Sequence, residues 1–149
     1  MAQSTDQILA SRRVLLLSFL VGWTAWYGSF TLQETGIQSV FPPSVNFTLG
    51  FVGVIGAIIY TISIMKIVGI RKKYRDDPAA LAALTDDLQV RNRNETIRYG
   101  FIFLILVQLV MVLFGDILGW SAMVGAHVTI FFGVTMTILA AIWIDMKEG

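Results

Sequence analysis

The sequence predicts an all-α integral membrane protein, a four-helix bundle built from two helical hairpins, with the N and C termini cytoplasmic. Three observations support this prediction. The chain is 56% hydrophobic and only 14% charged, and its mean hydropathy is +0.72, well above that of ordinary soluble domains. It contains four apolar stretches close to the length of about 20 residues that a helix needs to cross a bilayer. Its basic residues all fall on one side of the resulting arrangement.

The first span is predicted at about residues 14–32. Arg12 and Arg13 precede it, and the apolar run is longer than the core of a secretory signal, so we interpret it as a retained span. Aromatic residues crowd its outer half, where rings of this kind usually anchor a helix at the lipid–water interface. An aromatic wall for a quinone or pigment is the alternative role for these residues, which are Trp23, Trp26, Tyr27 and Phe30.

The second span is predicted at about 47–70 and the third at about 99–115, joined by a cytoplasmic helical loop, 71–98. Lys66 lies near the inner end of the second span, where its long side chain can reach the interface. A helix is expected to begin at Asp77 and run on into the third span, because no glycine or proline follows Pro78 until Gly100. Glu95 is spaced to pair with a basic residue one turn away, at Arg91 or Arg98.

The fourth span is predicted at about 120–144 and contains small residues at every fourth position. Small residues at this spacing form one stripe along a helix and allow another backbone to approach closely. The second span offers a similar surface, so we expect these two helices to pack together. The predicted packing residues are Ser121, Gly125, Thr129, Gly133, Thr137 and Ala141 in the fourth span, and Gly50, Gly53, Gly56 and Ala57 in the second.

The distribution of charge predicts the orientation of the chain. The two short loops at 33–46 and 116–119 contain no lysine or arginine, whereas the basic residues lie before the first span, around the loop at 71–98, and after the fourth span. By the positive-inside rule, both termini and the loop at 71–98 are cytoplasmic. The whole chain, 1–149, is therefore predicted to be a single transmembrane domain in an inner or plasma membrane.

The one histidine, His127, lies within the fourth span. It is about 160° around the helix from Gly125 and Thr129, so it should face a different neighbour from the small residues. We interpret it as a neutral side chain bonded to a carbonyl, to Asp116 or to a side chain of the first span. The alternatives are an axial ligand of a haem or chlorophyll-type pigment, a relay with Asp116, and a metal site with Asp116 and Glu34. No cofactor is required by the sequence.

The composition also narrows the classes of function. Without cysteine there are no thiolate metal sites, and a net charge of +1 does not favour a nucleic acid partner. The spans carry few ionisable groups and no catalytic constellation, so we expect no enzyme. The sequence favours an accessory, structural or assembly subunit that contacts other membrane-protein subunits or a second copy of itself. The alternatives are a pigment- or haem-binding subunit through His127 and a small transporter or channel using Lys66, Asp116 and His127.

Overall fold

The computed structural model describes residues 5–73, 87–115 and 117–147. These residues form four long helices, α1 (Thr5–Glu34), α2 (Pro43–Lys73), α4 (Asp87–Phe114) and α5 (Ala122–Lys147), with a short 3-10 helix, η1 (Ile37–Val40), after α1. The prediction of an all-α fold is confirmed for this part of the chain. Each of the four helices contains a segment long and apolar enough to cross a membrane.

Each observed helix extends beyond its predicted span at one end or at both. α2 begins at Pro43 rather than near residue 47, because proline suits the first position of a helix, where its fixed φ is favourable and no N–H is needed. The carbonyl of Pro42 accepts the N–H groups of Val45 and Asn46 at 3.0 and 3.2 Å. α4 runs without a break from Asp87 through the third span, as predicted. The predicted helix start at Asp77 lies outside the described residues.

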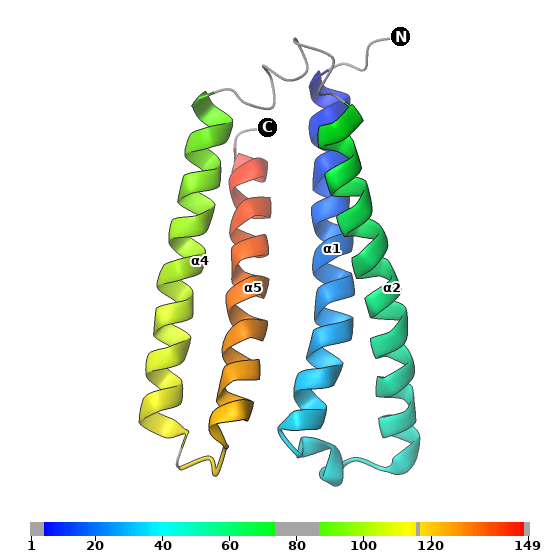
Figure 1. Cartoon of the computed structure of the whole chain (residues 1–149), viewed down its shortest axis with the longest axis vertical. Coiled ribbons are helices and arrows are strands. Elements are labelled where there is room, and N and C mark those ends of the chain that lie inside the picture. Colours follow the sequence, from blue (N-terminus) through cyan, green and yellow to red (C-terminus); the bar gives the residue numbers. More distant parts are fainter. Residues whose placement is uncertain (1–4, 74–86, 116, 148–149) are drawn as a thin grey trace.

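The helices form two hairpins that stand in an open row (Figure 1). α1 packs on α2, α4 packs on α5, and the two hairpins meet where α1 packs on α5. The order across the row is therefore α4, α5, α1, α2, and the two outer helices each leave one long side without a neighbour from the described part of this chain. The row is open rather than a closed ring of four helices.

The buried core lies where α1, α5 and α2 come together. Trp23 is at its centre with 6% of its surface exposed, and its ring stacks on that of Tyr27 at a centroid distance of 4.5 Å. The expectation that Trp23 anchors the helix at the interface is therefore wrong, because its side chain is buried against α5 and α2. The core contains Trp23, Ile138 and Ile142, with Leu16, Phe19, Leu20, Tyr27, Tyr60 and Val134 packed against them.

The backbones of α1 and α2 touch at a pair of glycines. A Cβ atom added to Gly22 would lie 2.5 Å from the backbone nitrogen of Tyr60, and one added to Gly56 would lie 2.5 Å from that of Trp26. A Cβ at Gly53 would contact Ser29, also on α1, whereas Gly50 has open space above it. The small residues of α2 that make close contacts therefore pack on α1, its hairpin partner.

The small residues of α5 pack on α4. A Cβ at Gly133 would lie 3.0 Å from Leu104 Cδ1, and Thr137 lies directly against Gly100. The prediction that the fourth span packs on the second is therefore wrong. The short connection between α4 and α5 makes them antiparallel neighbours, and α1 lies between α5 and α2.

Two members of the predicted α5 stripe have other surroundings. Ser121 precedes α5, and its hydroxyl accepts the N–H of Val124 at 3.3 Å, as an N-cap does. Gly125 has no heavy atom within 4 Å of the position its Cβ would take. The stripe is thus partly a helix contact and partly open surface.

Candidate functional site

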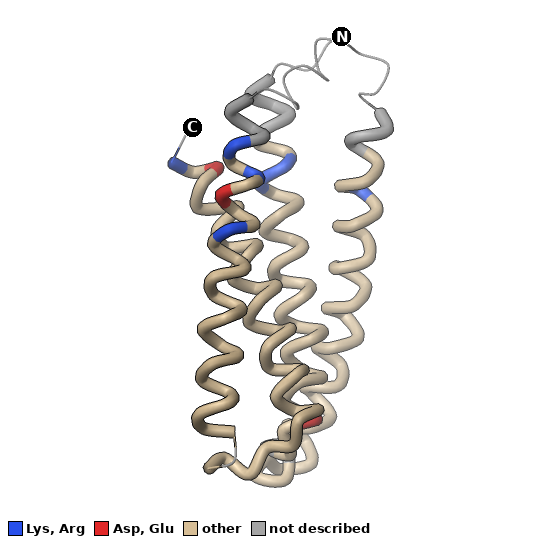
Figure 2. The backbone as a smooth tube through the Cα atoms, turned by 60° about the vertical axis from the view of Figure 1, so that its left-hand side comes forward, with Lys and Arg blue, Asp and Glu red and all other residues tan. Residues whose placement is uncertain are grey.

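Charged residues gather at one end of the molecule. Figure 2 shows the lysines and arginines of the described part near the end where α1 begins and α5 ends. On α4, Arg91 pairs with Glu95 at 3.6 Å, one of the two pairings that the spacing predicts, and both side chains are well exposed. A surface pair of this kind contributes little to stability.

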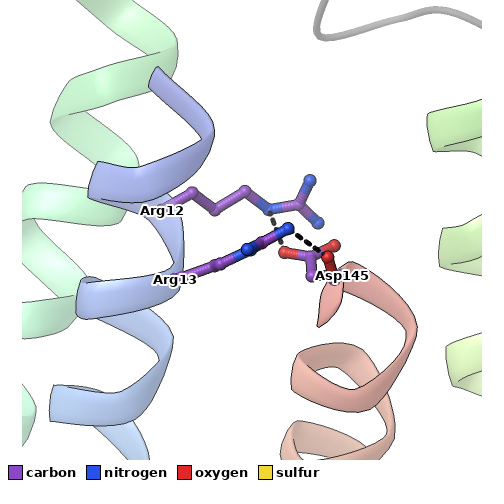
Figure 3. Close-up of polar contacts among 3 residues, drawn as sticks. All are labelled: Arg12, Arg13 and Asp145. Atoms are coloured by element: carbon purple, nitrogen blue, oxygen red, sulfur yellow. Dashed lines mark hydrogen bonds and ion pairs between the residues drawn. The ribbon is translucent and has the colours of Figure 1, made fainter. Parts of the chain in front are cut away.

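A buried carboxylate lies at this charged end, between the two hairpins (Figure 3). Asp145 of α5 is only 9% exposed, and its Oδ2 lies 3.7 Å from Nε of Arg12 on α1. Arg13, the next residue on α1, donates from a terminal guanidinium nitrogen to the backbone carbonyl of Asp145. Two adjacent arginines of one hairpin therefore hold the last turn of the other, and we call these three residues the arginine–aspartate clasp.

The clasp corrects an expectation drawn from the sequence. The sequence pattern indicates only an orientation signal at Arg12 and Arg13, and it predicts that the spans bury few ionisable groups. A signal was present in the sequence, because Asp145 follows the last apolar run, whose end is predicted to lie on the same side as Arg12 and Arg13. What the sequence does not reveal is that α1 and α5, separated by more than a hundred residues, are neighbours.

The second polar contact between the hairpins involves His127. Its Nδ1 lies 2.9 Å from the hydroxyl of Tyr27 on α1, and its ring forms a T-shaped pair with that of Phe30 at a centroid distance of 5.0 Å. A first-span side chain is one of the three partners that the sequence suggests for this histidine. The expectation that His127 and the small-residue stripe face different helices is confirmed, since His127 faces α1 and Gly133 faces α4.

The ring of His127 has one nitrogen left for another role. With Nδ1 occupied by Tyr27, Nε2 has no hydrogen-bond partner among the residues that the structure describes. A histidine that ligates a metal usually donates its other ring N–H to a second residue, and His127 matches this arrangement in the tautomer in which Nδ1–H donates to the hydroxyl of Tyr27. Tyr27 thus orients the imidazole, and the sequence had not identified Tyr27 as a partner.

The proposed roles for Asp116 fall on a residue outside the described part. Its relay with His127 and its metal site with His127 and Glu34 are therefore predictions without a structural test. Within the described residues, no three histidine or acidic side chains lie close enough together to hold a metal ion. Glu34 is exposed at the end of α1 away from the basic residues.

Comparison with known proteins adds no assignment. No protein-family model, curated protein or solved structure matches this chain. The function is therefore inferred from the helix row, the clasp and the His127 contact.

Proposed function

We propose that this protein is an integral membrane subunit with an accessory, structural or assembly role in a larger membrane complex. The observation that carries the proposal is the open helix row. In α4, only 6% of the most apolar 18-residue window is buried inside the chain, against 33% in α5. A row of this kind has a stable joint in its middle and two outer helices whose apolar sides are available to other subunits.

The proposed orientation follows from the charge distribution. The basic residues at the end that holds the clasp would lie on the cytoplasmic side of an inner or plasma membrane, together with both termini. The opposite end, with η1 and the connection between α4 and α5, would lie outside. Arg12 and Arg13 then serve both as an orientation signal and as the partners of Asp145.

The hydroxyl groups within the spans support a structural role. The hydroxyls of Ser29, Thr31 and Ser63 each donate to the carbonyl four residues earlier in their own helix, at 2.6 to 2.8 Å. This bonding satisfies the hydroxyl locally, so these groups need no solvent inside the bilayer. Such an arrangement favours a packing subunit over a transporter or channel, which needs polar groups directed along a shared path.

Purification from native membranes tests the proposed role. A C-terminally tagged chain extracted in mild detergent should elute with one or more other membrane proteins in a reproducible ratio. The same preparation after harsh detergent should contain the tagged chain alone. Recovery of an isolated chain under both conditions, from membranes that resist alkaline carbonate extraction, would contradict the accessory role while leaving membrane insertion intact.

A second candidate function is a haem- or pigment-binding subunit, favoured by His127, whose Nε2 has no partner among the residues that the structure describes. The ring is held by Tyr27 and bordered by Phe30, so its second nitrogen is oriented and unoccupied by the described residues. If the candidate is right, protein purified from native membranes has a visible absorption band that His127→Ala removes. A band that persists in His127→Ala, or a colourless preparation that retains its partner proteins, would eliminate this candidate.

A further inference from the structure

A groove lies between the end of α4 and the start of α5. It is separate from the arginine–aspartate clasp and from the contact of His127 with Tyr27. It has a volume of about 480 Å³ and opens on the side of the pair. Its walls include Gln108 and Val112 of α4 and the α5 residues Gly125 and Thr129. Gly125 forms part of the groove surface, and no heavy atom lies within 4 Å of the position that its Cβ would take. Another helix can therefore approach this part of α5 closely.

Gln108 places an incompletely bonded amide on the wall of this groove. Its Oε1 lies 3.0 Å from the hydroxyl of Thr129, whose single proton is shared with the carbonyl of Gly125 at 2.8 Å. Its side-chain nitrogen carries two N–H groups, for which the described residues provide no partner. The side chain is exposed at the surface of the chain, so in a bilayer those donors face lipid.

The position of Gln108 along α4 makes this exposure unfavourable. It precedes the end of α4 at Phe114 by about two turns, or about 9 Å, and follows Arg98 by about 15 Å. In an inserted helix it therefore lies within the hydrocarbon core, which is about 30 Å thick. No water is available there to accept the amide hydrogens, and an unpaired polar group in hydrocarbon is costly.

We propose that the groove is a homodimer interface, occupied by the α4–α5 hairpin of a second copy of this chain. A primary amide carries donors on nitrogen and two acceptor lone pairs on oxygen. The Oε1 of Gln108 uses one lone pair for Thr129, so two Gln108 side chains can bond to each other reciprocally. The amide is thus complementary to its own copy.

The orientation of the chain in the membrane also favours a second copy of this chain as the partner in the groove. Two copies with the same orientation place Gln108 at the same depth, on either side of a two-fold axis along the membrane normal. A two-fold interface brings identical surface patches together. α4 is at the end of the row, so α1 and α2 lie away from this face and do not obstruct a second row (Figure 1).

Single cysteines test the interface, because the chain has none of its own. Val112, one turn from Gln108, is 72% exposed. Val112→Cys should form a disulfide-linked dimer when native membranes are treated with a mild oxidant. The matched control is Phe47→Cys, an 80% exposed position on α2, the helix at the opposite side of the row, near the same ends of the helices as Val112; it should remain monomeric.

Two further substitutions in the Val112→Cys background should weaken the dimer by different means. Gln108→Leu removes the amide pair and should lower the dimer association constant about tenfold, as expected for the loss of interhelical hydrogen bonding worth about 1 to 2 kcal/mol. Gly125→Leu fills the floor of the groove and should also reduce cross-linking. An unchanged helical circular dichroism spectrum and melting temperature would show that the hairpin itself remains folded.

The inference rests on the membrane insertion that the proposed function assumes, and it is independent of the accessory role. Equal cross-linking at positions 112 and 47, or cross-linking that both variants leave unchanged, would overturn the dimer. A Val112→Cys adduct to a different protein would overturn the choice of a second copy. Release of the chain by alkaline carbonate would refute insertion itself, whereas a membrane-resistant monomer would refute the dimer alone.

Discussion

At the scale of single residues, one polar contact inside the apolar spans, between His127 and Tyr27, joins the two hairpins. His127 and Tyr27 are separated by a hundred positions in sequence and lie 2.9 Å apart. Neither side chain is fully buried, but both lie within segments of transmembrane length. A hydrogen bond in such surroundings matters mainly because its loss leaves a polar group unsatisfied.

Substitutions at His127 should distinguish a hydrogen-bonding role from a purely apolar one. His127→Leu leaves the hydroxyl of Tyr27 without its partner and should lower the free energy of unfolding by about 1 to 3 kcal/mol. His127→Gln keeps a donor and an acceptor at similar reach and should remain close to the parent chain. Unfolding in mixed detergent micelles measures both, and in the Tyr27→Phe background the difference between the two variants should shrink.

Asp145 supports a second prediction at the residue scale. Asp145→Asn removes the charge that faces Arg12 while keeping nearly the same shape, so the clasp loses its ion pair. We expect a loss of about 1 to 3 kcal/mol in the free energy of unfolding, less than for a fully buried pair because the Arg12 side chain is 34% exposed. Glu95→Gln, which removes an exposed partner of Arg91, is the matched control and should change the free energy by less than about 1 kcal/mol. Equal effects of the two substitutions would show that the clasp does not hold the hairpins.

At the scale of helices, each hairpin is held by close contact between small residues. The tightest contact is between α1 and α2, where Gly22 and Gly56 allow the two backbones to touch. Gly22→Ala places a Cβ 2.5 Å from the backbone of Tyr60, so α2 must move. Overpacking of this kind typically costs about 1 to 3 kcal/mol.

Gly50→Ala provides the control for this prediction, because open space surrounds the Cβ position and alanine is the better helix former. We expect Gly22→Ala to lower the melting temperature in detergent and Gly50→Ala to leave it unchanged or raise it slightly. If both variants melt together with the parent chain, the close approach at Gly22 does not contribute to the stability of the hairpin.

At the scale of the whole molecule, the segregation of charge predicts orientation in the membrane. Ala80→Cys and a C-terminal tag should be accessible only from the cytoplasm, and Gln38→Cys should react with an impermeant thiol reagent from outside. Labelling of sealed cells and of inside-out vesicles provides the measurement. Reaction of Ala80→Cys from outside in intact cells would reverse the proposed topology.

The positions of the four helices along the chain could be predicted from the sequence, because length and apolarity are local properties of a run of residues. The direction of His127 relative to Gly133 could be predicted for the same reason, since the angle between two side chains on one helix depends only on their spacing. The charge pattern likewise favours one orientation without reference to the fold.

The choice of neighbours was decided by the tertiary structure. Small residues in α2 and α5 indicated close packing, yet their partners proved to be α1 and α4, because a stripe of small residues permits approach by any helix and does not specify which one. The burial of Trp23 and Asp145 was also not predicted, because residue type alone does not show which helix will cover a side chain. An aromatic ring or a carboxylate near the end of an apolar run suits the interface equally well, and only the packing of α1 against α5 places these two side chains inside.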